Sequence, residues 1–298
     1  MKLEGIISWL DKTLDVAKFD DVANNGLQIE RNPGPVKKVA FAVDASVKTV
    51  NAAIAAGAQL LVVHHGISWG GGIKKIAGGA RKVILAATEG NLALYACHLP
   101  LDANRKVGNN WELARHIGLR KGFSAFSYHG NVIGVVGYLP RGRKVLLGKK
   151  EYDFPAGRIG ICSGGAASFA EEAKTLGCKA FLTGEASWGE KVAAENIGAN
   201  MICAGHYATE VFGVQALAKL MSEELNGLET IFVDEQPDDE PVEPTPEDAA
   251  ATQAPKPPKA AKPKAATASK AAKPKATSAP KAAKPKTSAP KAKSAKVK

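Results

Sequence analysis

The spacing of hydrophobic residues alternates between helical and extended patterns along the first 235 residues. Residues 2–17 place most of their apolar side chains on one helical face. Three short apolar runs, at 36–43, 59–63 and 92–97, are typical of strands buried on both faces. Helical patterns at 47–57 and 80–89 separate these runs. The order strand, helix, strand predicts parallel strands joined by right-handed crossovers.

The second half of this region continues the same alternation. Strands are expected at 131–139, 158–162, 180–183 and 201–203, and helices at 109–116, 167–176, 189–197 and up to Leu225. A basic segment, 141–150, lies between the first two strands. We therefore expect an α/β fold with mixed, largely parallel sheets flanked by helices.

Two polar stretches are expected to be loops. Residues 20–27 include Asn25-Gly26, a dipeptide typical of turns. Residues 68–79 are rich in glycine but lack the spacing of a phosphate-binding loop. An adaptable rim beside the site described below is the favoured interpretation of 68–79. The turn Ser163-Gly164-Gly165 either presents backbone N–H groups to an anion or allows close packing, and close packing is slightly favoured.

The charge of the chain changes sharply near its end. The formal net charge is +11, but residues 249–298 hold 14 lysines and no acid, and residues 233–248 hold eight acids and no lysine or arginine. Without these two segments, residues 1–232 carry +5. We expect a folded domain at 1–235, an acidic linker at 236–248 and a disordered basic tail at 249–298.

Two further features bear on the cellular setting. The four cysteines, Cys97, Cys162, Cys178 and Cys203, form no CxxC pair, which favours buried thiols in a reducing compartment over disulfides. The N-terminus lacks a signal-peptide layout, and no apolar run is long enough to cross a bilayer. We expect a cytoplasmic protein without a membrane partner.

Histidines follow three of the predicted strands. His64 and His65 come directly after the run 59–63, and His98 follows 92–97 with Asp102 four residues later. After 201–203 come His206 and Glu210, which share one face of a helix. Taken singly, the pair at 64–65 is equally consistent with a surface turn, and Glu210 with a helix cap. His116 and His129 are expected to be structural.

Together, these strand ends predict a metal site. The carboxyl ends of strands in an open α/β sheet are where such folds bind ligands. Imidazole and carboxylate ligands suit Zn²⁺, Mn²⁺, Fe²⁺ or Co²⁺ better than Ca²⁺. Five or six ligands exceed the needs of one tetrahedral ion, so two ions bridged by a carboxylate fit better.

The sequence resembles a known dinuclear-metal family over residues 1–235. The matching motifs are NNGLQ at 24–28, HHG at 64–66, HLPLDA at 98–103, GNN at 108–110, TGE at 183–185 and GHYATE at 205–210. These motifs are similar to those of the Nif-three-like proteins, called GTP cyclohydrolase 1 type 2 homologues, in their compact bacterial form. The resemblance implies a toroidal homohexamer with a mixed α/β fold.

The resemblance also implies a ligand assignment. One ion would be bound by His64, Asp102 and Glu210, and the other by His65 and His206, with Glu210 bridging. His98 would lie beside them as a further ligand or a supporting residue.

Two classes of function follow from this site. The first is a metal-dependent hydrolase acting on a small molecule, a nucleotide or another phosphoester, with Glu185 as the candidate acid or base and Asn25 and Asp44 as supporting residues. A carboxylate that stabilises a helix start is the alternative for Glu185. The second class is a metal-binding scaffold or regulator without turnover. The lysine-rich tail either contacts nucleic acid through phosphates or only aids solubility.

Overall fold

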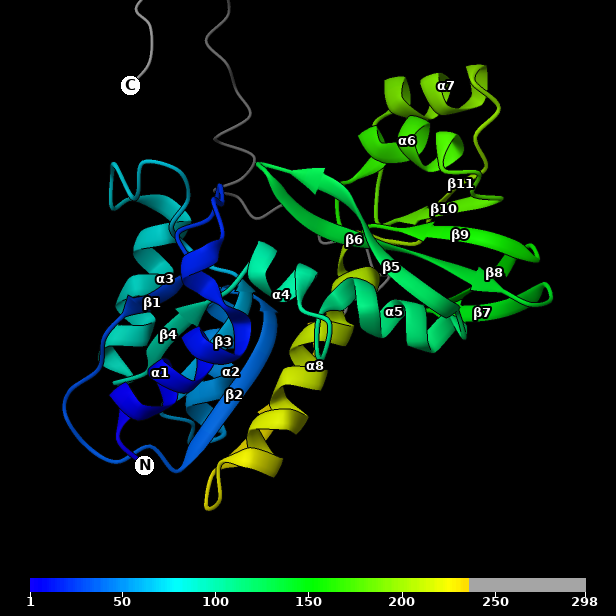
Figure 1. Cartoon of the computed structure of the whole chain (residues 1–298). Coiled ribbons are helices and arrows are strands. Elements are labelled where there is room, and N and C mark those ends of the chain that lie inside the picture. The colour runs from blue at the N-terminus through cyan, green and yellow to red at the C-terminus, as the bar shows by residue number, and fades with distance from the viewer. Residues whose placement is uncertain (236–298) are drawn as a thin grey trace, which may run out of the picture. The chain divides into compact units, whose positions relative to one another are not determined.

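The computed structural model describes residues 1–235, which form one compact unit. Figure 1 shows two separate sheets, with the long helix α8 running between them. The predicted acidic linker, 236–248, and the predicted basic tail, 249–298, lie outside the described residues.

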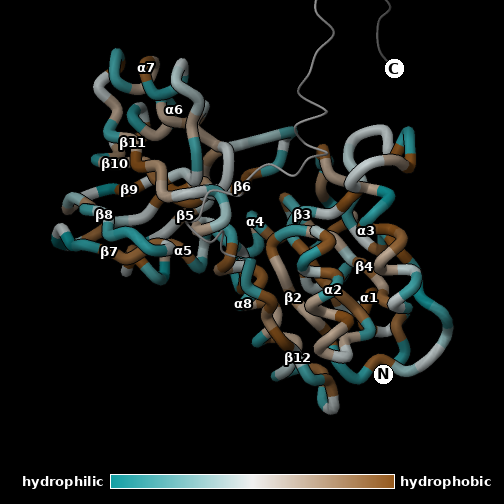
Figure 2. Tube along the Cα trace, turned by 180° about the vertical axis from the view of Figure 1, so that it is seen from behind, coloured by the Kyte–Doolittle hydropathy of each residue, from teal (hydrophilic) through white to brown (hydrophobic). Residues whose placement is uncertain are grey.

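The N-terminal sheet has five strands in the order β1–β4–β3–β2–β12, and all neighbours are parallel except β1 and β4. Its strands are β1 (Gly26–Ile29), β2 (Lys38–Asp44), β3 (Leu60–His65), β4 (Ala93–Ala96) and β12 (Glu229–Phe232). Figure 2 shows hydrophobic positions running along β2 and β3. Alternate residues of β2 face opposite sides: Phe41 packs in the cluster beneath α1 and α8, and Ala42 in the cluster beneath α2 and α3. Burial on both faces explains why these strands lack polar alternation.

The second sheet has the order β11–β10–β9–β6–β5, with β9, β10 and β11 parallel and β5 and β6 antiparallel. Its strands are β5 (Arg120–Tyr128), β6 (Asn131–Leu139), β9 (Gly157–Ile161), β10 (Ala180–Thr183) and β11 (Met201–Cys203). A separate hairpin consists of β7 (Arg143–Leu147) and β8 (Lys150–Phe154).

The helices cover both sheets. They are α1 (Leu3–Leu14), α2 (Val47–Ala55), α3 (Gly78–Glu89), α4 (Leu99–Ala103), α5 (Asn109–Ile117), α6 (Ala170–Thr175), α7 (Trp188–Asn196) and α8 (His206–Glu224), with short 3-10 turns at Val16–Lys18 and Ala167–Phe169. No helix among residues 1–235 combines the length and apolar character that crossing a bilayer requires.

The expected fold class is confirmed, with local corrections. The segment 20–27 is not entirely a loop, because its last two residues begin β1. The residues after His98 form the short helix α4, which was not expected, and Pro100 is well tolerated in its first turn. The strand that carries His64 and His65 includes both histidines. The basic segment 141–150 forms most of the β7–β8 hairpin, whose apolar residues Val145, Leu147 and Phe154 pack inward.

Candidate metal centre

The six residues predicted to bind metal come together between the two sheets. His64 and His65 end β3, His98 follows β4, and Asp102 lies on α4. His206 and Glu210 occupy the first two turns of α8, which follows β11. In Figure 1 the end of β3, α4 and the start of α8 converge at this position. Segments far apart in the sequence therefore supply one cluster.

The cluster contains a buried trio of residues, His64, Asp102 and Glu210, which we call the inner group. One potential ligand atom from each residue lies within 4.8 Å of the others. His64 Nε2 is 3.6 Å from Asp102 Oδ1 and 3.6 Å from Glu210 Oε1. All three residues are at most 5% exposed.

A second trio, His65, His206 and Glu210, meets the same 4.8 Å limit, and we call it the outer group. Glu210 Oε2 is 3.3 Å from His65 Nε2 and 3.2 Å from His206 Nε2. The side chain of His206 is 38% exposed, so this group reaches solvent. Glu210 therefore directs Oε1 to the inner group and Oε2 to the outer group, which is the geometry of a bridging carboxylate.

Each of the four histidines has its Nδ1 atom next to an oxygen acceptor. His64 Nδ1 lies 3.0 Å from the Cys97 carbonyl oxygen, and His65 Nδ1 lies 2.8 Å from Asp44 Oδ1. His98 Nδ1 lies 2.9 Å from Asp21 Oδ1, and His206 Nδ1 lies 3.1 Å from Glu185 Oε1. A proton on Nδ1 donates to these oxygens and leaves the lone pair on Nε2. Metal-binding histidines in proteins are oriented in the same way.

Two buried atoms at the centre have no hydrogen-bond partner in the described part of the chain: His64 Nε2 and Glu210 Oε2. An unpaired buried polar atom costs about 1–3 kcal/mol, so native proteins rarely tolerate one without a reason. Both atoms belong to the trios described above and point toward their other members. A bound cation would satisfy both atoms, and the donor set of imidazoles and carboxylates suits a transition metal.

The pKa values in the cluster are shifted because imidazoles and carboxylates lie close together. Burial lowers the pKa of His64, but the charges of Asp102 and Glu210 raise it more strongly, to about 10. The adjacent carboxylate of Glu210 raises the pKa of His206 to about 9, against the effect of burial. Burial raises the pKa of Glu210, but His64 and His206 lower it well below its usual range. Without metal, His64 and His206 therefore bind a proton more strongly than an ordinary histidine does.

The turn Ser163-Gly164-Gly165 makes room for the cluster. Gly164 has a positive φ of 64°, and a Cβ atom there would contact Glu210 Oε1 and lie 3.2 Å from His206 Nε2. Ser163 Oγ donates to Asp102 Oδ1 at 3.2 Å, and Asn109 Nδ2 donates to the same oxygen at 2.9 Å. Close packing, the favoured interpretation of this turn, is what the structure shows.

Asp21 supports His98 and was not singled out from the sequence. Its Oδ1 faces His98 Nδ1, and its Oδ2 accepts from the backbone N–H of Leu99 at 2.9 Å and from Asn25 Nδ2 at 2.9 Å. Asn25 Oδ1 accepts from the backbone N–H of His98 at 2.7 Å. Burial raises the pKa of Asp21, but the hydrogen bond and charge of His98 lower it more strongly, to about 2. The closeness of this aspartate to the NNGLQ motif was the only available signal.

The expectation of a supporting role for Asn25 and Asp44 agrees with these contacts. Glu185 contacts His206 with a side chain that is 63% exposed. His116 and His129 lie apart from the cluster: His116 Nε2 is 3.1 Å from the Leu146 carbonyl oxygen, and His129 occupies an exposed turn with φ of 49°. All four cysteines are free thiols.

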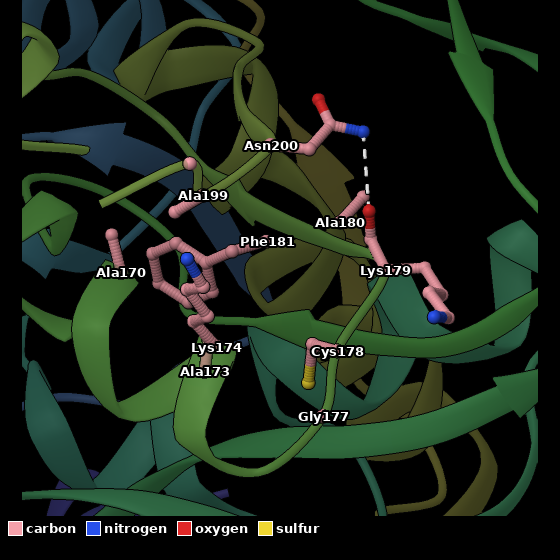
Figure 3. A pocket seen from close by; sticks show the side chains of 11 residues that line it. Ala170, Ala173, Lys174, Gly177, Cys178, Lys179, Ala180, Phe181, Ala199 and Asn200 are labelled. Carbon is pink, nitrogen blue, oxygen red and sulfur yellow. Dashed lines mark hydrogen bonds between the residues drawn. The ribbon is translucent and has the colours of Figure 1, made fainter. Parts of the chain in front are cut away.

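Two cavities of about 330 Å³ each have different linings. The first opens beside the cluster and is lined by several of its members and by Trp69, Tyr128 and Phe169. The second, shown in Figure 3, surrounds Phe181 and has Lys174, Cys178 and Asn200 on its wall. The second lining includes no histidine or carboxylate, so the chemistry of residues 1–235 points to the first cavity.

Comparisons with known proteins follow the same boundaries as the fold. The family described as Duf34/NIF3 (NGG1p interacting factor 3) matches residues 1–239. A relative from Archaeoglobus fulgidus, named GTP cyclohydrolase 1 type 2 homolog, is 40% identical over 244 residues, covering 78% of this chain and 98% of the relative.

Solved structures give the same picture. The protein ybgI, titled as of unknown function, is 29% identical with a TM-score of 0.69. A protein from Thermus thermophilus is 30% identical with a TM-score of 0.63. Each match covers 78% of this chain and 98% of the solved chain.

Proposed function

The chain belongs to the Duf34/NIF3 family, and we propose that it binds two divalent transition-metal ions and hydrolyses a nucleotide or another phosphoester with them. The observation that carries this proposal is the position of Glu210. Its two oxygens face two separate trios of potential ligands, each within 4.8 Å. One carboxylate shared in this way is typical of a dinuclear centre.

The proposed ligands divide along the two groups. His64, Asp102 and Glu210 would hold the inner ion, and His65, His206 and Glu210 would hold the outer ion. A third trio, His64, His65 and His98, also meets the 4.8 Å limit, which supports His98 as a further ligand or a neighbour of both ions. Zn²⁺, Mn²⁺, Fe²⁺ and Co²⁺ all suit these donors. Two such ions, when bound, lower the pKa of a water molecule and polarise an oxygen of the substrate.

The protein side chains would orient these ligands and control access. Asp44 and Glu185 hold the Nδ1 atoms of His65 and His206, which directs both Nε2 atoms toward Glu210. The contact with His206 supports a positioning role for Glu185, and its direct role as an acid or base stays a prediction. The partly exposed outer group and the adjoining cavity would admit substrate and water from one side.

A metal-binding scaffold without turnover is the second candidate. The cavity of about 330 Å³ beside the outer group favours the enzyme, because a purely structural metal site is normally closed by its protein ligands. The names of relatives such as the Archaeoglobus fulgidus protein support a nucleotide as the substrate.

The enzyme proposal is tested by turnover of the metal-loaded protein. Full-length protein is reconstituted separately with Zn²⁺, Mn²⁺, Fe²⁺ and Co²⁺ and incubated with GTP, other nucleotides and simple phosphoesters. We expect hydrolysis of at least one substrate, lost in His206→Ala and kept in His116→Ala. Two bound ions without hydrolysis of any substrate would favour the scaffold.

Two expectations about partners stay predictions. A homohexamer would be recognised by the mass of the particle in light scattering. If the lysine-rich segment 249–298 contacts nucleic acid, its deletion should abolish DNA binding at low salt and leave the metal content unchanged. DNA binding that survives the deletion would contradict the role of this segment.

A further inference from the structure

The cavity beside the candidate metal centre is lined by two kinds of residue. The polar ones belong to the cluster and include His65, His98 and Glu210. The apolar and aromatic ones include Trp69, Tyr128, Phe169 and Ile133. A volume of about 330 Å³ is at the lower end for sites that bind small molecules. A ligand that fills it would need a polar end and a flat apolar end.

Trp69 is held in place among the aromatic residues of this lining. Its Nε1 donates to the Gly66 carbonyl oxygen at 3.0 Å, and its backbone forms a bridge with Ala23. Its ring lies 5.2 Å from the ring of His98 and 5.9 Å from that of His65. Trp69 nevertheless remains 39% exposed. The segment 68–79 thus places a rigid indole at the edge of the metal cluster.

Tyr128 contributes a second aromatic ring from the opposite half of the molecule. It ends β5 and is 40% exposed. The residues after it, His129 and Gly130, turn the chain with positive φ, and the His129 ring lies 4.4 Å from the Tyr128 ring. Each half of the described chain therefore supplies one exposed aromatic side chain to the same cavity. Exposed aromatic rings in a concave site are typical of ligand recognition.

We propose that Trp69 and Tyr128 bind the heterocycle of a small nucleotide by stacking, while its phosphate lies toward the histidines and carboxylates. This inference rests on the proposed function and narrows its substrate class. Every nucleobase offers a flat π face, so stacking provides affinity without hydrogen bonds to the base edges. The apolar and aromatic lining residues match the base, and the cationic metal centre would match the phosphate.

The test compares a nucleotide with the corresponding sugar phosphate, which lacks the base. Full-length protein loaded with Mn²⁺ is titrated by calorimetry with GMP and with ribose 5-phosphate. We expect GMP to bind about 10-fold or more tightly, the range that base–aromatic stacking gives. Trp69→Ala should remove most of this difference and leave the affinity for ribose 5-phosphate unchanged. Trp69→Phe should keep most of it, because the ring is retained.

Trp188→Ala is the matched control, since Trp188 is 81% exposed and does not line the cavity. It should bind both ligands like the wild type. The metal content of every variant is measured first, which separates a lost ring from a misfolded site.

Equal binding of GMP and ribose 5-phosphate by the wild type would overturn the inference, as would binding of neither ligand. An unchanged preference for GMP in Trp69→Ala would also overturn it. The proposed function is judged separately, by metal content and phosphoester hydrolysis. Hydrolysis of simple alkyl phosphoesters without any preference for a base would remove this inference and leave the proposed function in place.

Discussion

The inner and outer groups share Glu210 but differ in their surroundings. The inner residues are almost completely buried, and Asp102 is held by the neutral donors Asn109 and Ser163. The outer histidines are held by Asp44 and Glu185, whose side chains are 48% and 63% exposed. One half of the centre is therefore built into the core and the other lies at the surface.

This difference predicts that the inner and outer positions bind their ions with different affinity and exchange rate. A buried site whose ligands are held by hydrogen bonds should release its ion slowly, because release would leave buried ligand atoms unpaired. A partly exposed site allows water and substrate to reach its ion. We expect the inner ion to bind more tightly and the outer ion to exchange more readily.

The largest effect should follow from Asp102→Asn. The change removes the negative charge of the inner group but keeps the size of the side chain. We expect at least about a 100-fold loss of affinity for the inner ion, more than the loss of a supporting residue causes. Metal content measured by elemental analysis should fall from near two ions to near one per chain.

Asp11→Asn is the control for this variant. Asp11 accepts a hydrogen bond from the Tyr95 hydroxyl at 2.8 Å and does not belong to the metal centre. It should keep two ions. If Asp102→Asn also kept two tightly bound ions, the inner group would not be a metal site.

His206→Ala should affect the outer position alone. Removal of its Nε2 leaves only His65 and Glu210 in the outer group, whereas the inner ligands are untouched. We expect one tightly bound ion to remain, with the second lost on dialysis against a weak chelator. Loss of both ions at equal rates would contradict independent inner and outer positions.

Substitution of the two carboxylates that hold the outer histidines should have a smaller effect. Asp44→Asn and Glu185→Gln each weaken the orientation of one imidazole, and loss of such a support typically costs about 10- to 100-fold in metal affinity. Asp44 should matter more, since it is less exposed and its contact, at 2.8 Å, is shorter than the 3.1 Å contact of Glu185. Chelator competition on both variants measures the order, and a larger effect of Glu185→Gln would reverse it.

The smallest expected effect is the release of protons when metal binds. In the metal-free protein the pKa of His64 is raised to about 10 and that of His206 to about 9, so both are protonated at pH 7. A metal ion needs the lone pair of each Nε2, so loading both groups should release about two protons. The affinity of each group should fall about 10-fold per pH unit as the pH drops below the raised pKa.

Calorimetry in buffers with different ionisation enthalpies counts these protons. Release of none at pH 7 would show that the two histidines are already neutral without metal.

The sequence predicted the cluster because several strands end in the same residue type. His64, His98 and His206 each follow or end a short apolar run. The parallel neighbours β3 and β4 bring His64 and His98 to one edge of the first sheet. His206 follows β11 of the second sheet, and its approach to the other two depends on how the two sheets meet. The three-dimensional neighbours of these histidines were harder to predict. Ser163 and Asn109 reach Asp102 from distant segments, and only the packing of the second sheet against α5 and α8 brings them there.

The elements that were missed have a common physical origin. β5 and the β7–β8 hairpin carry many exposed residues, so their pattern lacks the apolar runs of the central strands. The short helix α4 has a proline in its first turn and only five residues, too few for a helical period to show. Sequence patterns report burial well where both faces of an element are covered and poorly at the edges of a sheet.

The shared carboxylate is tested most directly by the metal content of the wild type and of Glu210→Gln, both purified without added metal. Glu224→Gln, an exposed change on the same helix, is the control. The account predicts near two ions per chain in the wild type and the control, and loss of both ions in Glu210→Gln. Two ions retained in Glu210→Gln, or none in reconstituted wild type, would contradict a dinuclear centre joined by Glu210.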